Sequence, residues 1–278
     1  SNEIHLAWQV YIIPKTSSDY WMIRVDAVNN SIIGIDNYTD YDNWGTPDVN
    51  AAAKYPAFMM GNIQSAENDF LDFKKAEDPS VVTTATYRVV PYPAEAPSFP
   101  NGAHALRTDP WLAAPGNATS LKWNTGAAAT DYNYTRGNNV WAYEDRTAPT
   151  NTGTVAKSAA STTALPNLTF DYTPNYTVDP TQTTPVPNQQ FNITNLFYWN
   201  NVIHDILYQY GFDEPAGNFQ DDNQGRGGAG NDHVNGEAQD GGGTNNANFA
   251  TPADGGSGRM QMYLWTGGTP NRDGDVDN

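Results

Sequence analysis

The clearest regular pattern in the chain is a single helical repeat over residues 195–210. Its apolar side chains recur three and four positions apart, which is the spacing of one helical face, at Leu196, Trp199, Ile203, Ile206, Leu207 and Tyr210. Thr194 is the expected N-cap, and Gly211 stands where a left-handed residue would end the helix. Aromatic residues also occupy the other faces, so we expect this long helix to be buried on more than one side.

Short strand-like segments near the N-terminus predict a small antiparallel hairpin module. Aromatic and β-branched residues dominate 4–13, apolar and polar residues alternate over 20–27, and a shorter strand is expected at 32–36. A weaker amphipathic helix over 65–77 would be anchored by Phe70, Leu71 and Phe73. Another strand is expected at 87–92, so we place a domain boundary near Ala85. The predicted domains are therefore residues 1–84 and 85–278.

The last 64 residues combine glycine-rich turns with polar strands. They hold 15 of the 24 glycines and no lysine. Turn residues separate three strand-like segments, at 232–239, 245–250 and 259–265. We expect these segments to form a meander whose middle or outer strand is unusually polar. Together with the long helix, they predict an α+β, β-rich fold.

Charge and composition exclude several classes of function. The chain has 14 basic and 31 acidic side chains and a formal charge of -17, which argues against a nucleic-acid partner and against an anionic membrane surface. It has no cysteine, so disulfides, thiolate metal sites and a cysteine nucleophile are excluded. The sequence lacks a run of 18 apolar residues, so no membrane span is expected.

Few residues stand out as candidates for chemistry. No two of the four histidines, His5, His104, His204 and His233, lie three or four positions apart, so no local pair can bind zinc from one helical face. His204 is either a metal ligand or a hydrogen-bonded structural residue of the helix. The alternating acids Asp273, Asp275 and Asp277 resemble part of a calcium loop, and the alternative is a solvated acidic turn.

Several long motifs, in order, resemble the fungalysin family of secreted, thermolysin-like zinc metallopeptidases. They are TRGNNVWA at 135–142, NLFYWNNVIHDILY at 195–208, NNANFATP at 245–252, RMQMYLW at 259–265 and RDGD at 272–275. The resemblance covers residues 86–278, and residues 1–45 resemble, more weakly, the last strands of the family's propeptide. It implies that 1–84 are the end of a propeptide with a linker. Residues 85–278 would be the N-terminal lobe of the catalytic domain.

The resemblance also implies where the metal chemistry lies. In this family the zinc-binding His-Glu-x-x-His helix begins a few residues after the Arg-Asp-Gly-Asp segment, and the sequence ends at Asn278. We therefore expect zinc in the parent enzyme, with its ligands outside these 278 residues. A catalytic zinc needs three protein ligands and an open position, so the fragment is expected to be inactive alone. Its expected partners are a peptide or protein substrate and the C-terminal half of its own catalytic domain, in a secreted enzyme.

A substrate-binding role is implied for one strand. In thermolysin-like enzymes an edge strand with an Asn-Ala motif pairs with the extended substrate. Asn246 and Ala247 match that motif here, between Asn245 and Asn248. Such β-augmentation uses the unpaired main-chain groups of a sheet edge. The alternative for these residues is an ordinary solvent-facing edge strand.

Two other functions are compatible with the sequence. The chain could be a non-catalytic extracellular module that binds carbohydrate or peptide, with its 8 Trp and 16 Tyr forming a platform. In addition, the first 80 residues could act as an inhibitor or folding aid for the parent enzyme.

Overall fold

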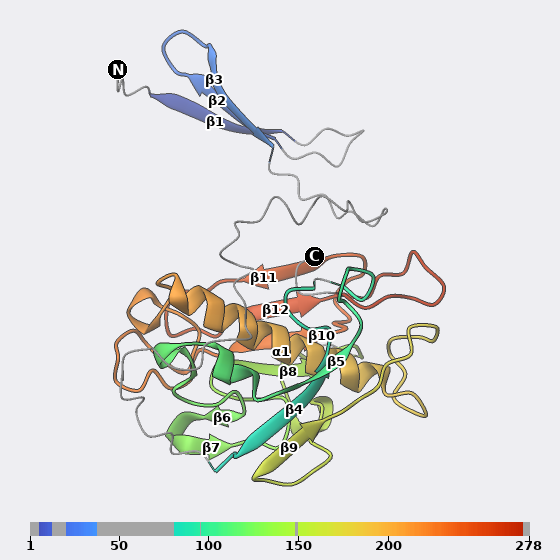
Figure 1. Ribbon diagram of the computed structural model, residues 1–278. Coiled ribbons are helices and arrows are strands. Elements are labelled where there is room, and N and C mark those ends of the chain that lie inside the picture. The colour runs from blue at the N-terminus through green and yellow to red at the C-terminus, as the bar shows by residue number, and fades with distance from the viewer. Residues whose placement is uncertain (1–5, 13–20, 38–80, 95, 148–149, 275–278) are drawn as a thin grey trace. The chain divides into compact units, whose positions relative to one another are not determined.

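The computed structural model describes residues 6–12, 21–37, 81–94, 96–147 and 150–274 (Figure 1). The chain divides into two compact units, residues 1–63 and 64–278. The amphipathic helix predicted at 65–77 lies outside the described residues. Among the helices that are described, none has the length and apolar character needed to cross a bilayer.

The first unit contains a three-stranded antiparallel sheet in the order β1-β2-β3. The strands are β1 (Ala7–Ile12), β2 (Trp21–Asp26) and β3 (Ile32–Asn37), which lie where the sequence pattern predicted them. The turn between β2 and β3 is held by Asp26, whose Oδ1 accepts hydrogen bonds from the amides of Val28 and Asn29. Asn30 in this turn has a φ of 60°, a conformation that asparagine tolerates better than most residues.

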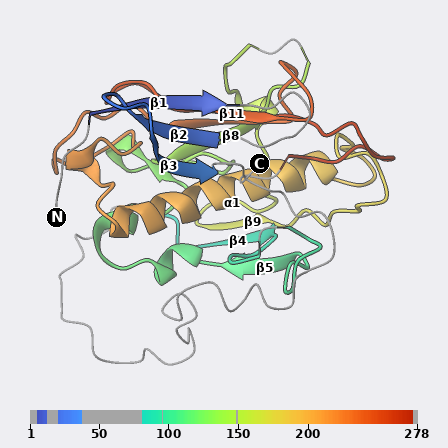
Figure 2. The same cartoon turned by 90° about the horizontal axis from the view of Figure 1, so that it is seen from above.

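The second unit places one α-helix between two sheets (Figures 1 and 2). The larger sheet has the order β11-β12-β10-β8, the smaller one has the order β5-β4-β9, and β6 and β7 form a short ribbon. The bounds are β4 (Thr84–Val89), β5 (Ala105–Thr108), β6 (Thr125–Gly126), β7 (Thr130–Asp131), β8 (Val140–Glu144), β9 (Asn167–Phe170), α1 (Asn188–Gln209), β10 (Val234–Ala238), β11 (Ala247–Ala250) and β12 (Arg259–Met262). Five short 3₁₀ helices complete the described part: η3 (Pro110–Ala113), η4 (Gly116–Thr119), η5 (Ala127–Ala129), η6 (Val155–Lys157) and η7 (Glu214–Ala216).

The core lies on both sides of α1, as the aromatic sequence of the helix predicted. Toward the larger sheet, Leu196 packs against Gly236 of β10, where an added Cβ would lie 3.4 Å from its Cδ2 atom. Toward the smaller sheet, the ring of Phe197 lies 6.0 Å from that of Tyr87, which stacks on Phe170 at 5.2 Å. Burying each such side chain stabilises the fold by about 1.5–3 kcal/mol. The helix therefore joins the two sheets.

The start of α1 differs from the sequence prediction. The helix begins at Asn188 after Pro187, so Thr194 is not its N-cap. Thr194 is buried inside the helix, where its hydroxyl donates to the carbonyl of Gln190. The first turns of the helix, before residue 195, carry many polar residues, so the apolar repeat did not extend to them. The end was predicted correctly, since Gly211 follows the helix with a φ of 92°.

The predicted C-terminal meander is also corrected by the structure. β10 and β12 are adjacent and parallel, and β11 pairs with the far side of β12 in antiparallel register. After β10 the chain therefore first forms the outer strand β11. It then returns to form β12 between β11 and β10. Arg259 of β12 is ion-paired with Glu237 of β10, which contributes to placing β12 beside β10. Such a tertiary contact has no local sequence pattern.

Gly137 offers a test of the packing between the loop before β8 and Trp123. A Cβ at position 137 would lie 1.6 Å from the main-chain oxygen of Trp123, so Gly137→Ala must displace one of the two segments. We expect overpacking of this kind to lower the free energy of unfolding by about 1–3 kcal/mol, measured by urea denaturation. Gly267→Ala is the matched control, because nothing lies within 4 Å of its added Cβ. Equal stability of the two variants would contradict this packing.

Candidate functional site

β11 is the outermost strand of the larger sheet, and no other described strand pairs with its outer side. The amide of Tyr263 donates to the carbonyl of Asn246 at 3.3 Å, which makes these two residues a hydrogen-bonded pair. Hydrogen-bonded and non-bonded pairs alternate along an antiparallel ladder. With the register Ala247 to Met262 and Asn248 to Gln261, the main-chain groups of Asn248 face β12. Those of Ala247 and Phe249 face outward.

The outward amide of Ala247 is covered by a neighbouring side chain. Oδ1 of Asn246 accepts a hydrogen bond from this N–H at 2.8 Å, and Asn246 is exposed. A rotation of one exposed side chain would therefore free the amide of Ala247 for an incoming carbonyl. The Ala247 amide is thus satisfied in the absence of a partner strand and can still be freed.

The side chains of the strand alternate between the two faces of the sheet. Ala247 packs against the core, and the Phe249 ring lies 5.7 Å from the ring of Phe219. On the opposite face, Nδ2 of Asn248 donates to the Tyr263 hydroxyl at 2.7 Å. These contacts fix the strand and leave its outer main chain exposed.

Asn245 forms the corner before the strand. It takes a φ of 55°, and its Oδ1 accepts a hydrogen bond from the Thr266 amide at 2.7 Å. Its own amide donates to the carbonyl of Leu264 at 2.8 Å. Asn245 therefore holds the corner that leads into Asn246 and Ala247.

A buried polar layer, which the sequence analysis missed, lies on the Asn248 face of the sheet. Asp145, Glu237 and Asp240 are the one group of three His, Cys, Asp or Glu side chains in the described ranges that could hold a metal ion. Arg259 binds Glu237 through Nε at 2.9 Å and through a terminal nitrogen at 2.8 Å, and Lys157 binds Asp145. The only signal in the sequence is that polar or aromatic residues alternate with small or apolar ones along β8, β10 and β12.

This layer does not fit a catalytic zinc site. It contains no histidine, and its carboxylates already bind Arg259, Lys157, the Gln261 amide group and main-chain amides. Zinc sites use mainly nitrogen and sulfur ligands, and a catalytic zinc needs an open position. No zinc chemistry can be derived from the described residues.

His204 of α1 lies in a hydrogen-bonded polar cluster. Its Nδ1 lies 3.0 Å from Oδ1 of Asp205, and its Nε2 lies 3.4 Å from Nδ2 of Asn218. The other oxygen of Asp205 accepts a hydrogen bond from the indole of Trp123 at 3.0 Å. Both ring nitrogens thus face protein groups, which matches the structural alternative for this histidine.

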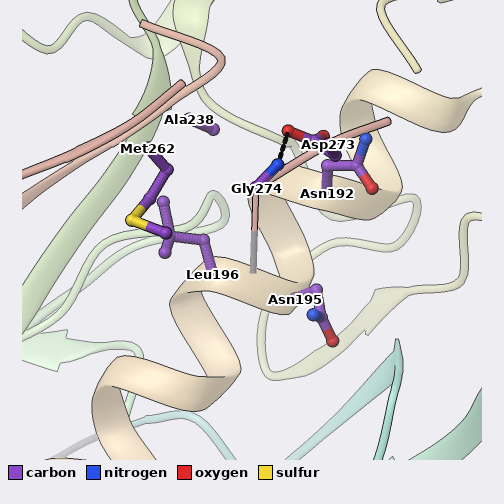
Figure 3. Close-up of a pocket in the computed structure, with 7 residues that line it drawn as sticks. All are labelled: Asn192, Asn195, Leu196, Ala238, Met262, Asp273 and Gly274. Atoms are coloured by element: carbon purple, nitrogen blue, oxygen red, sulfur yellow. Dashed lines mark hydrogen bonds between the residues drawn. The ribbon is translucent and has the colours of Figure 1, made fainter. Parts of the chain in front are cut away.

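A small pocket lies beside α1 where the described chain ends (Figure 3). It is lined by Asn192, Asn195, Leu196, Ala238, Met262, Asp273 and Gly274. Asp273 accepts hydrogen bonds from Nε2 of Gln239 at 2.8 Å and from the Gly274 amide at 3.0 Å. Although Asp273 is only half-buried, protein atoms surround its carboxyl group, and this desolvation raises its pKa to about 7.

The predicted calcium ligands can be followed only in part. Asp275 and Asp277 lie outside the described residues. Asp273 uses both carboxylate oxygens for hydrogen bonds within the protein. Calcium binding by these three residues therefore stays a prediction.

Comparison with known proteins identifies the family to which this chain belongs. A family model described as fungalysin metallopeptidase (M36) matches residues 86–278. The chain therefore belongs to the fungalysin metallopeptidase family, as its motifs predicted.

Individual relatives agree with this assignment. The chain is 45% identical to an extracellular metalloproteinase MEP of Fusarium vanettenii over 197 residues, which are 71% of this chain and 29% of the relative. It is 42% identical to extracellular metalloproteinase 2 of Trichophyton tonsurans over 196 residues, 70% of this chain and 29% of the relative. It is 44% identical to extracellular metalloproteinase 3 of Trichophyton soudanense over 196 residues, 70% of this chain and 46% of the relative. The matched region thus spans less than half of each of these relatives.

The hydrogen-bond pattern of β11 predicts different losses of stability for two proline substitutions. Asn248→Pro removes an amide that faces β12 and leaves a carbonyl of the ladder unpaired, so the free energy of unfolding should fall by about 1–3 kcal/mol. Ala247→Pro removes an outward amide, as edge strands tolerate, and should cost less than about 1 kcal/mol. Urea denaturation of both variants checks this. A larger loss for Ala247→Pro would reverse the assigned direction of the two amides.

Proposed function

We propose that these residues are part of a secreted zinc-dependent endopeptidase, in which β11 binds the main chain of the substrate. Membership in the fungalysin metallopeptidase family supports the peptidase activity, and the relatives' names support secretion. The observation that carries the binding role is the outer side of β11, with which no other described strand pairs and toward which the main-chain groups of Ala247 and Phe249 point. An extended peptide can add to such an edge as a further strand.

The residues in and before the strand would have different roles in substrate binding. The amide and carbonyl of Ala247 would pair with the peptide, and the short side chain would allow its close approach. Asn246 would move from the Ala247 amide to the substrate, because its Oδ1 now occupies that amide. Asn245 and Asn248 would hold the strand through Thr266 and Tyr263.

The metal ion needed for hydrolysis would be bound by residues outside this sequence. The 278 residues contain no His-Glu-x-x-His motif. Zinc would activate the attacking water in the whole enzyme, and the lobe described here would hold the substrate beside it. The 278-residue chain alone would then be inactive, and its C-terminal partner would be the remaining part of the catalytic domain. Residues 1–84 would be the end of the propeptide and a linker.

The described aromatic residues do not favour a carbohydrate-binding or peptide-binding platform. Six of them are fully buried, namely Trp111, Trp123, Tyr87, Tyr143, Phe170 and Phe197, and the strongly exposed ones lie on separate segments, namely Trp8, Tyr176, Tyr210 and Phe249. A platform needs aromatic faces that are open to solvent.

Hydrolysis by the whole enzyme tests the peptidase proposal. The full open reading frame should yield an enzyme that cleaves casein and that loses this activity in the presence of a chelator. The 278-residue chain alone should show no cleavage under the same conditions. Cleavage that resists the chelator would refute the metal-dependent mechanism.

The role of the edge is tested in the same enzyme by Ala247→Pro. Removing one main-chain hydrogen bond to the substrate should lower kcat/KM for a peptide by about two- to tenfold, since one such bond contributes about 0.5–1.5 kcal/mol. Ala247→Ser keeps the amide and is the matched control, which should retain the activity of the unmodified enzyme. Equal kcat/KM in the two variants would show that the Ala247 amide does not bind substrate.

A further inference from the structure

The buried polar layer beneath the edge hairpin carries an unbalanced charge. Asp145, Glu237 and Asp240 are at most 1% exposed, and their carboxylates lie within 4.8 Å of one another. The two cations in contact with them are Lys157, which binds Asp145, and Arg259, which binds Glu237 and lies 3.5 Å from Asp240. Three negative groups thus face two positive ones. An uncompensated buried charge is costly, and one proton on a carboxylate would balance the layer.

The contacts of the three carboxyl groups show where this proton can lie. Asp145 is held ionised, because Lys157 and the amides of Asn151 and Thr150 outweigh the effect of burial and lower its pKa. Glu237 and Asp240 instead face the same cation, because a terminal nitrogen of Arg259 lies 2.8 Å from Oε2 of Glu237 and 3.5 Å from Oδ2 of Asp240. Two carboxylates beside one guanidinium leave one negative charge unbalanced, and a proton on one of them would neutralise it.

We propose that Glu237 carries one proton, which it directs toward the Asp240 carboxylate, and that this proton controls the order of the connection that leads into the edge strand β11. Loss of the proton would leave two facing carboxylates that repel each other, and the connection between β10 and β11 would loosen. The importance of this control for substrate binding rests on the function proposed above for β11. The titration itself does not depend on that function.

The position of Asp240 couples the pair to the edge. Asp240 lies at the start of the connection 239–246, where its amide donates to the Met262 carbonyl at 2.9 Å. Its Oδ1 accepts from the Gly242 amide at 2.5 Å, and its Oδ2 accepts from Nε2 of Gln261 on β12 at 3.0 Å. The amide of Gly241 donates to the carbonyl of Asp145 at 3.0 Å. A displaced Asp240 would therefore disturb both β12 and the corner at Asn245.

The other groups that face Glu237 set the direction of its titration. Burial raises the pKa of Glu237 to about 7, the Arg259 guanidinium opposes this shift, and the nearby Asp240 carboxyl group acts with burial. Tyr143 of β8 donates to Oε1 of Glu237 at 3.1 Å, and burial raises the pKa of this phenol, so it remains a donor. Asp145 and Lys157 complete the layer on the β8 side, and Arg259 and Gln261 complete it on the β12 side.

The sign of the pH dependence follows from this shift. A carboxyl whose pKa is raised from 4.5 in the unfolded chain binds its proton more tightly in the folded state. Its contribution to stability is complete below pH 4.5 and is lost as the pH rises through about 7. Alkaline conditions should thus loosen the edge hairpin, and acidic conditions down to about pH 5 should tighten it.

Hydrogen exchange on the 278-residue chain tests the proposal. After correction for intrinsic exchange rates, protection of the β11 and β12 amides should fall by at least about tenfold between pH 5 and pH 8, which corresponds to one unit of pKa shift. Glu237→Gln, which cannot lose a proton, should lose most of this pH dependence, and the remainder would come from Asp273, whose pKa is also about 7. Glu144→Gln is the matched control on the adjacent strand and should retain the pH dependence. The same fall in protection in Glu237→Gln would overturn the proposal.

A second measurement does not require a folded variant. In the unmodified chain labelled with ¹³C at the glutamate carboxyl groups, one resonance should titrate with a midpoint near pH 7. If every glutamate carboxyl group titrates below about pH 5.5, Glu237 does not carry the proposed proton. Both measurements are independent of peptidase activity, so they can fail while the Ala247→Pro result holds, and the reverse also applies.

Discussion

The described part of the second unit depends on the burial of α1 from two sides. A helix with one apolar face can cover a single sheet, whereas α1 meets the larger sheet through Leu196 and the smaller one through Phe197. Two of its buried polar residues, Asn200 and Asn201, fit this position because they bond within the helix. Nδ2 of Asn201 donates to the carbonyl of Phe197 at 2.9 Å, and Asn200 bonds to Leu196 in the same way. A buried asparagine without such a partner would cost about 1–3 kcal/mol.

The position of α1 explains why charged groups gather on the far face of the larger sheet. One face of β8, β10 and β12 packs on the helix and is apolar, with Val140, Ala142 and Met262 in the core. The opposite face carries the residues that alternate with these, including Tyr143, Glu237 and Arg259. This second face is covered by the chain after β8, where Gly153 lies so close to Tyr143 that a Cβ would come within 2.7 Å of its ring. Covering a polar face removes it from water, so its charges must be paired or neutralised.

Local patterns in the sequence predicted several elements, but neither the strands β5 to β9 nor the arrangement of the sheets. The apolar repeat identified the body and the end of α1, because three- and four-residue spacing and Gly211 are local features. The repeat could not show that the helix extends back to Asn188, where Asn188 and Gln189 interrupt the apolar pattern. The motif around Asn246 and Ala247 marked a segment that forms the outer strand. The order of β11, β12 and β10 and the ion pairs of Glu237 and Asp145 depend on residues far apart in the sequence.

The edge strand meets two opposing physical requirements. Unpaired main-chain groups on an exposed strand promote pairing with any other chain, and folded proteins limit this by short strands and polar residues. β11 is only four residues long, and Asn246 and Asn248 alternate with Ala247 and Phe249. The Asn246 side chain also occupies the outward amide of Ala247, so a second strand must compete with an existing hydrogen bond. This single hydrogen bond would disfavour pairing with an arbitrary strand. A peptide that makes several main-chain hydrogen bonds at once could still displace it.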